Sequence, residues 1–260
     1  MGVRLLRGLW YISGMKKFSG FSREMPAFFR ALERNNKRDW FGPRKGHFEE
    51  HVRGPMVELV TLLNEEMRRF SVDHVAEEPG KLLYRIYRDT RFSKDKTPYK
   101  THLGTTFAHR TLSRHGGAGY YFEISHRYVG IAGGVYMPGP EELLAIRKAI
   151  AAKPREFLEV FGGAKTKRMF GALQGEKLKR LPKAWADRAD AAEGEFLKYK
   201  QFYWWVELPA EVAMTPKLPG VLTAHFKAMS ESLGWFNRAI LAARRAEKDN
   251  EGPKRPEPMW

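Results

Sequence analysis

The sequence predicts a single α+β domain, in which helices pack a central, mostly antiparallel sheet and a long helix lies near the C-terminus. Two observations predict this class. Segments of strand-like alternation are separated by segments of helical period, and no internal repeat or long linker divides the 260 residues. Hydrophobic residues make up 43% of the chain, which is typical of a soluble globular protein with a buried core.

Three helices are expected in the first quarter of the chain. Ser22 is a suitable N-cap for the first, whose apolar stripe ends at Asn35-Asn36. Asp39 caps a second helix that runs to about residue 52, where Gly54-Pro55 breaks it. Pro55 then opens a third helix, because proline is well tolerated in a first helical turn.

Alternating side chains predict four strands: 82–88, 119–126, 129–135 and 202–207. The middle two are expected to form a hairpin that turns at Arg127-Tyr128. Further helices are expected from Pro140 through Ile150, from Pro154, and along a final apolar stripe: Leu222, Phe226, Met229, Leu233, Phe236 and Ile240.

The ends and the composition limit what the protein can be. We expect residues 1–14 to be an N-terminal extension before a natural start at Met15, residues 15–247 to form the domain, and 248–260 to be a flexible tail. No apolar run is long enough to span a membrane, so we expect a cytoplasmic protein without a membrane partner. The chain has no cysteine, which excludes disulfides, thiolate ligands and a cysteine nucleophile. Its net charge of +16 favours anionic partners.

The most informative segment is RIYRDTRFSKDKTPYKTH, residues 85–102, which has a net charge of +4 with aromatic rings between the cations. Guanidinium forks and ammonium groups in this density are typical of a site that holds phosphate. Like charges packed so closely also repel one another unless an anion lies between them. The predicted ligand-binding residues are Arg85, Tyr87, Arg88, Arg91, Lys94, Lys96, Lys100 and Tyr121. The alternative is an ordered, salt-bridged loop that only clamps the edge of the sheet.

Catalytic residues are not determined by the sequence, but three candidates lie in or near this segment. His102 could exchange protons at neutral pH, and Asp89 could orient cations or hold magnesium beside a phosphate. Alternation places Glu123 and Tyr121 on the polar face of the expected strand 119–126. It places Arg85 on the same face of the sheet in the expected strand 82–88. We therefore expect an ion pair between Arg85 and Glu123. A half-buried ion pair of purely structural importance explains the same pattern equally well.

Other motifs carry less weight. A second basic cluster in residues 165–180 has a net charge of +5 and is read first as a solvated loop, and second as a nucleic-acid contact. HFEEH, residues 47–51, matches a zinc-peptidase pattern, but no third ligand is identifiable and we expect no metal site. In Tyr203-Trp204-Trp205, alternation buries Trp204 and exposes Trp205, so core packing is the favoured role.

The basic segment, together with several other segments, resembles the domain of unknown function (DUF) 2461 family of bacterial and fungal proteins. The segments are NNKRDWF at 35–41, GYYFEI at 119–124, GGVYMPGPEEL at 133–143, GEKLKR at 175–180 and KQFYW at 200–204, with Tyr136 where the family pattern has Trp. The resemblance covers about residues 18–241, which supports a single domain and a start at Met15. It implies no established activity and no catalytic residue.

Three functions follow from these observations. The favoured one is binding of a phosphate-bearing ligand, such as a nucleotide, at the basic and aromatic residues. The second is a non-catalytic nucleic-acid-binding protein in which both basic clusters form one surface. The third is a scaffold whose basic segment binds nothing. Whether the protein is an enzyme, what cofactor it uses and its oligomeric state are left open by the sequence.

Overall fold

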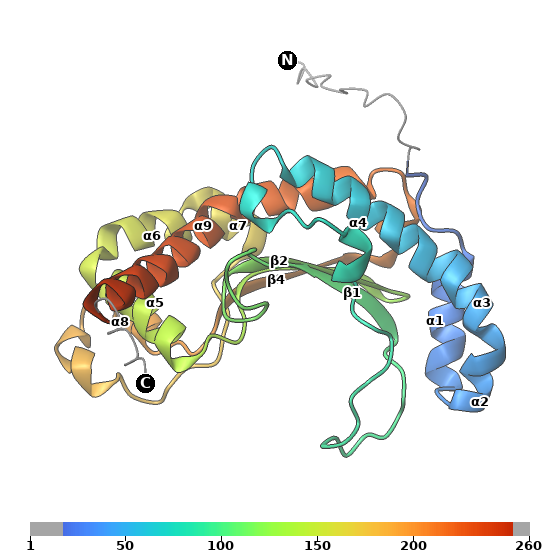
Figure 1. Ribbon diagram of the computed structural model, residues 1–260, viewed down its shortest axis with the longest axis horizontal. Coiled ribbons are helices and arrows are strands. Elements are labelled where there is room, and N and C mark those ends of the chain that lie inside the picture. Colours follow the sequence, from blue (N-terminus) through green and yellow to red (C-terminus); the bar gives the residue numbers. More distant parts are fainter. Residues whose placement is uncertain (1–17, 252–260) are drawn as a thin grey trace, which may run out of the picture.

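The computed structural model describes residues 18–251, in which one layer of helices covers one face of a sheet (Figure 1). The predicted extension 1–14, and most of the predicted tail, lie outside the described residues. The sheet has four strands in the order β1-β2-β3-β4, and every neighbouring pair is antiparallel. The strands are β1 (His102–Phe107), β2 (Gly119–Ser125), β3 (Tyr128–Val135) and β4 (Phe202–Pro209). The predicted α+β class with a long C-terminal helix is confirmed.

The helices lie in three groups along the chain. The first group is α1 (Glu24–Arg34), α2 (Arg38–Phe41), α3 (Lys45–Phe48) and α4 (Gly54–Met67). The second group is α5 (Pro140–Ala152), α6 (Pro154–Gly162), α7 (Ala164–Phe170) and α8 (Gly194–Leu197). The third is the long helix α9 (Leu218–Glu251). Figure 1 shows α4 and α9 above the sheet, with α1–α3 at one end and α5, α6 and α8 at the other.

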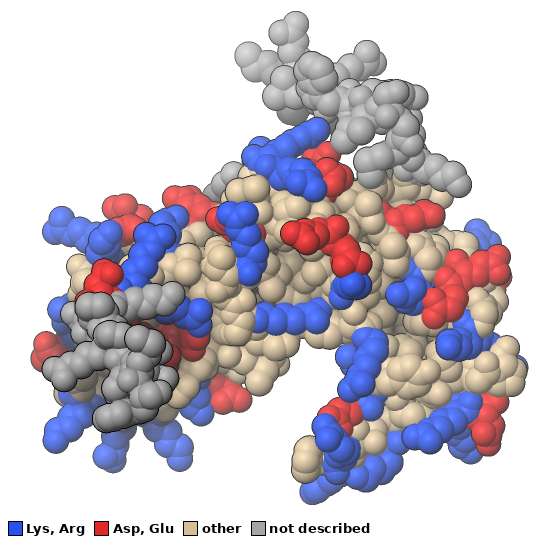
Figure 2. All heavy atoms as spheres, in the orientation of Figure 1, with Lys and Arg blue, Asp and Glu red and all other residues tan. Residues whose placement is uncertain are grey.

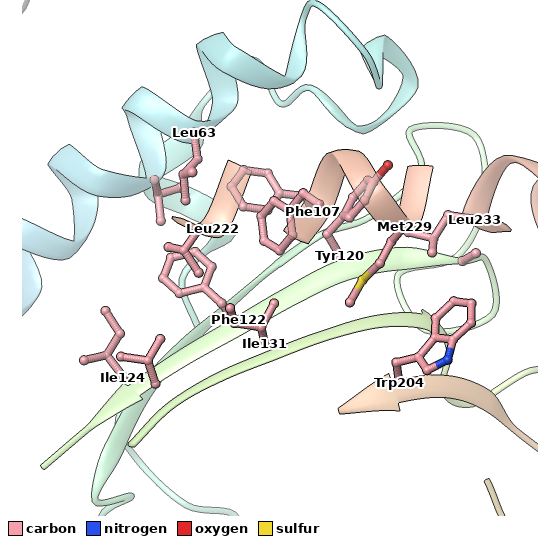
Figure 3. Packing of buried hydrophobic residues seen from close by; sticks show 14 of the residues in the cluster. Leu63, Phe107, Tyr120, Phe122, Ile124, Ile131, Trp204, Leu222, Met229 and Leu233 are labelled. Carbon is pink, nitrogen blue, oxygen red and sulfur yellow. The ribbon is translucent and has the colours of Figure 1, made fainter. Parts of the chain in front are cut away.

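The core lies between the sheet and the helices above it. The rings of Tyr120 and Phe226 have centroids 5.0 Å apart, and a side chain at Gly133 would collide with Met229, so α9 lies close against β3. All six residues of the predicted apolar stripe in this helix are buried. The side chains that meet in this layer are labelled in Figure 3: Leu63, Phe107, Tyr120, Phe122, Ile124, Ile131, Trp204, Leu222, Met229 and Leu233.

The expected break at Gly54-Pro55 is wrong. A π-helical turn at Glu49–Arg53 leads directly into α4, and Gly54 keeps helical backbone angles. Pro55 lies in the first turn of α4, where proline is well tolerated, and the chain stays helical through it.

The expected strand 82–88 is also wrong, and β1 takes its place at the edge of the sheet. Residues 85–99 instead form a segment that we call the projecting arm. Its two sides are joined by a hydrogen bond of 2.8 Å from Arg88 N–H to Pro98 O, and at its base Lys100 N–H donates to Ile86 O, also at 2.8 Å. The arm hangs from the sheet on the side away from α4 and α9 (Figure 1). Tyr84 N–H donates to Gly104 O at 2.9 Å, which is the contact between the base of the arm and β1.

The other outer strand, β4, is also bonded to a neighbouring segment. Gln174 and Tyr203 exchange two backbone hydrogen bonds, of 2.7 and 3.1 Å, in an isolated antiparallel bridge. None of the helices between residues 18 and 251 combines the length and apolarity that crossing a lipid bilayer requires.

Candidate functional site

The face of the sheet that points away from α4 and α9 carries a cavity of about 560 Å³, here called the open-face pocket. Side chains alternate along each strand, so the residues between the core-facing ones point into this pocket. Aromatic rings form most of its walls: Tyr84, Tyr121, Tyr128, Tyr136, Tyr203 and Trp205. Beside the projecting arm, the surface is visibly hollowed (Figure 2).

Two glycines let aromatic rings lie against the sheet beside Glu123. In the register, Gly104 of β1 and Gly130 of β3 lie directly opposite Glu123 on its two sides. A Cβ at Gly104 would lie 2.5 Å from the Tyr121 hydroxyl, and one at Gly130 would collide with the Trp205 ring. The missing side chains therefore make the space in which these two rings flank the carboxylate.

Glu123 is a buried carboxylate, with a relative exposure of 6%. The Tyr121 hydroxyl donates to its Oε2, and the Tyr128 hydroxyl donates to its Oε1 at 2.6 Å. Burial, together with the Glu123 charge, raises the pKa of both tyrosines, so both keep their protons near neutral pH. The Nε2 atom of His102 lies 3.5 Å from Glu123 Oε2. Burial lowers the pKa of His102, and the carboxylate opposes that shift.

Two cations lie at another side of the pocket, against the ring of Tyr84. The Arg114 Cζ atom lies 4.1 Å from the ring centroid and the Lys100 Nζ atom 5.2 Å from it. The Arg114 guanidinium donates to Leu82 O at 2.7 Å. Among the described residues, neither cation lies within 4.0 Å of a carboxylate oxygen. Burial lowers the pKa of Lys100, against the attraction of Glu123.

Three of the residues predicted from the sequence line the pocket: Lys100, Tyr121 and Glu123. A fourth, His102, lies 3.5 Å from Glu123 but is not part of the lining. The remaining predicted residues lie on the arm: Arg85, Tyr87, Arg88, Asp89, Arg91, Lys94 and Lys96. Tyr87 packs its ring against Tyr99 at 5.3 Å, and Arg85 is exposed. The basic segment is therefore divided between a pocket and an arm, and does not converge on one point.

Much of the charge on the arm is matched within the arm. The Arg91 guanidinium donates to both oxygens of Asp89, at 3.0 and 2.7 Å, and lowers the pKa of that carboxyl to about 2. Arg88 pairs with Asp95, and Lys96 donates to Thr90 O at 2.9 Å. The argument that these cations need an external anion is weakened, because neighbouring carboxylates supply the counter-charge for Arg88 and Arg91.

The expected Arg85–Glu123 pair is wrong. Because 82–88 is not a continuous strand, the alternation assumed for it does not hold, and Tyr84 is the residue that turns into the pocket beside Tyr121, with ring centroids 6.2 Å apart. Glu123 is held by tyrosine hydroxyls instead.

Sequence reasoning missed several pocket residues: Tyr84, Arg114, His115, Tyr128 and Tyr136. The small residues that alternate along β3, Gly130, Ala132 and Gly134, were a usable signal, since small residues on one face of a strand leave room for rings from its neighbours. Trp205 was correctly placed on the face opposite the buried Trp204, and it lines the pocket. Arg114 lies in the loop between β1 and β2, where no periodic pattern identified it.

Other candidate motifs lie outside the pocket. In the second basic cluster, Lys177 lies 3.6 Å from Glu195 and above the ring of Tyr199, as a structural contact would. In the HFEEH segment, His47 lies 3.4 Å from Glu24. Within residues 18–251, no group of three or more His, Asp or Glu side chains is placed to hold a metal ion.

A comparison with protein families matches residues 24–235 to the model described as "Conserved hypothetical protein (DUF2461)". No curated protein and no solved structure matches the chain.

Proposed function

We propose a function for this chain, which belongs to the DUF2461 family of conserved hypothetical proteins. Its open-face pocket binds a small ligand of the nucleotide class, which carries a phosphate group and a planar ring. One observation carries the proposal. Lys100 and Arg114 border an aromatic cavity, and in the part of the chain that the structure describes neither cation has a carboxylate oxygen within 4.0 Å.

The two cations suit an anionic group of the ligand. A guanidinium and an ammonium close together repel one another, and burial makes the charge of Lys100 costly. A phosphate between them would relieve both costs and accept charge-assisted hydrogen bonds. Tyr84 fixes the position of the cations, because its ring contacts both and its hydroxyl is hydrogen-bonded to Thr106 at 2.9 Å.

The aromatic walls suit a planar ring. The centroids of the Trp205 ring and the Tyr121 ring lie 6.3 Å apart, and that of Tyr128 lies 6.1 Å from Trp205. Rings arranged in this way can pack against a base face to face or edge to face. Such stacking does not depend on which polar atoms the base carries. The volume of about 560 Å³ is within the range of pockets for small ligands.

Nucleic-acid binding along the arm is a second candidate, and a specific observation favours it. Phe92, on the arm, is 93% exposed, and the Arg91 Cζ atom lies 5.7 Å from its ring centroid. Lys and Arg side chains gather on the arm (Figure 2). Exposed cations beside an exposed ring are suited to a backbone phosphate and a stacked base.

The cytoplasmic location expected from the sequence stays a prediction.

The test is an isothermal titration of the protein with the four ribonucleoside monophosphates and with a single-stranded oligonucleotide. We expect Lys100→Met to weaken the tightest monophosphate at least about tenfold, since a hydrogen bond to a charged group contributes about 1.5–3 kcal/mol. The matched control, Lys94→Met, removes the same charge from the exposed arm and should leave that affinity unchanged.

Two results would sink the proposal: none of the monophosphates binds, or the two lysine variants bind them equally. An oligonucleotide affinity that falls steeply with salt and depends on Lys94, and not on Lys100, would favour the arm as a nucleic-acid contact instead.

A further inference from the structure

Around Glu123, the floor of the open-face pocket presents hydrogen-bond acceptors. An ionised carboxylate has no proton to donate, so the hydroxyl hydrogens of Tyr121 and Tyr128 are both directed at Glu123. Each phenol oxygen therefore presents only lone pairs in its other directions. The two carboxylate oxygens each accept one hydroxyl, and Oε2 also lies 3.5 Å from His102 Nε2. Each oxygen can still accept a further hydrogen bond.

The neighbouring donor is directed elsewhere. The indole N–H of Trp205 donates to Glu207 Oε1 at 2.9 Å, so it is already occupied. On either side of Glu123 the strands contribute glycine, Gly104 and Gly130, and hence no polar side chain. A ligand group that reaches this floor meets lone pairs, and an acceptor atom placed there would lose its hydrogen bonds to water without replacement.

We infer that the ligand of the open-face pocket presents to Glu123 a ring edge with two adjacent N–H donors, as guanine does. This inference rests on the proposed function and narrows it to one kind of base. Guanine has the N1–H and the 2-amino group side by side. Adenine and cytosine place a ring nitrogen acceptor beside their amino group, and the single N–H of uracil lies between two carbonyl acceptors. A carboxylate matches the guanine edge and repels the others.

The first test changes the ligand and leaves the protein intact. Wild-type protein is titrated with GMP, with IMP, which lacks the 2-amino group, and with AMP. We expect GMP to bind at least about tenfold more tightly than IMP, and IMP more tightly than AMP, because each step removes a donor or adds a facing acceptor. Equal affinities for GMP and AMP would overturn the inference, whatever any variant does.

The second test changes the carboxylate. Glu123→Gln replaces one of the two acceptors by a donor, so it loses one of the two hydrogen bonds to the guanine edge and matches the donor and acceptor of adenine. We expect it to weaken GMP about tenfold and to leave AMP unchanged or tighter. Glu195→Gln is the control, because it makes the same change at an exposed carboxylate outside the pocket.

The outcomes also separate this inference from the proposed function. If all the monophosphates bind equally and Lys100→Met weakens them all, the phosphate site stands and the guanine preference is refuted. If none binds to wild-type protein, both fall.

Discussion

Replacing Tyr128 by phenylalanine would remove one hydroxyl and keep the ring in the pocket wall. That hydroxyl donates to Glu123 Oε1 at 2.6 Å, and the carboxylate is 6% exposed. Loss of a hydrogen bond to a buried charged group costs about 1.5–3 kcal/mol. We therefore expect Tyr128→Phe to lower the free energy of unfolding by about 2 kcal/mol, the middle of that range.

The charge of Glu123 accounts for much of this effect, and a double-mutant cycle measures that part. In a Glu123→Gln background the acceptor is neutral, and a neutral hydrogen bond contributes only about 0.5–1.5 kcal/mol. Tyr128→Phe should then cost about 1 kcal/mol less than in the wild-type background.

The assay is urea unfolding followed by far-UV circular dichroism at neutral pH. Tyr203→Phe is the control, because Tyr203 lines the same pocket and its hydroxyl has no hydrogen-bond partner among the described residues. It should change the unfolding free energy by less than about 0.5 kcal/mol. If Tyr128→Phe costs no more than this control, the account of Glu123 as a carboxylate held by two phenols is refuted.

Two further changes test the core. Phe226→Ala, in the layer between α9 and the sheet, should lower the free energy of unfolding in urea by about 3–5 kcal/mol. Phe92→Ala, at the exposed arm, should lower it by less than about 0.5 kcal/mol. Equal losses in the two variants would contradict this packing. Burial lowers the pKa of His74 from about 6.5 to about 4, so the native state stays neutral when the unfolded chain takes up a proton. Stability present above pH about 6.5 is then lost as the pH falls towards 4, by about 3 kcal/mol. The test measures the unfolding free energy of wild type and of His74→Gln at pH 7 and at pH 4. Between these two pH values, the variant should lose about 3 kcal/mol less than wild type. Equal losses in the two proteins would refute this role of His74.

The helices were predicted best, because a helix shows its buried side within a few turns of contiguous sequence. The stripe from Leu222 to Ile240 in α9 is an example: the spacing alone identified six side chains that prove to be buried. The strands 119–126 and 129–135 were found for the same reason, since a hairpin pairs residues that are close in the sequence.

Strand β1 was missed because its own residues give a weak signal. HLGTTF contains a glycine and two threonines, and Thr105 and Thr106 are buried on opposite faces, so apolar and polar residues do not alternate. Its place in the sheet is decided by pairing with β2, about twenty residues along the chain, which local periodicity does not report.

The pocket could be predicted only in part for a similar reason. Glu123 and Tyr121 were placed on the correct face by alternation within one strand. Tyr84, Tyr128 and Trp205 join them only through the register of four strands and the turn of the arm, and register depends on contacts between distant residues. Charge density drew attention to the arm, where Asp95 and Asp89 supply the counter-charge for Arg88 and Arg91.

The segments bonded to the two outer strands have a consequence for how copies of the protein meet. A free strand edge is a template onto which a strand of another molecule can add, and proteins that expose one aggregate by this route. Tyr84 is bonded to β1 and Gln174 to β4, so part of each edge is already taken. The same two residues line the pocket. A variant that loosens either segment should therefore aggregate sooner in concentrated solution, as well as bind less tightly.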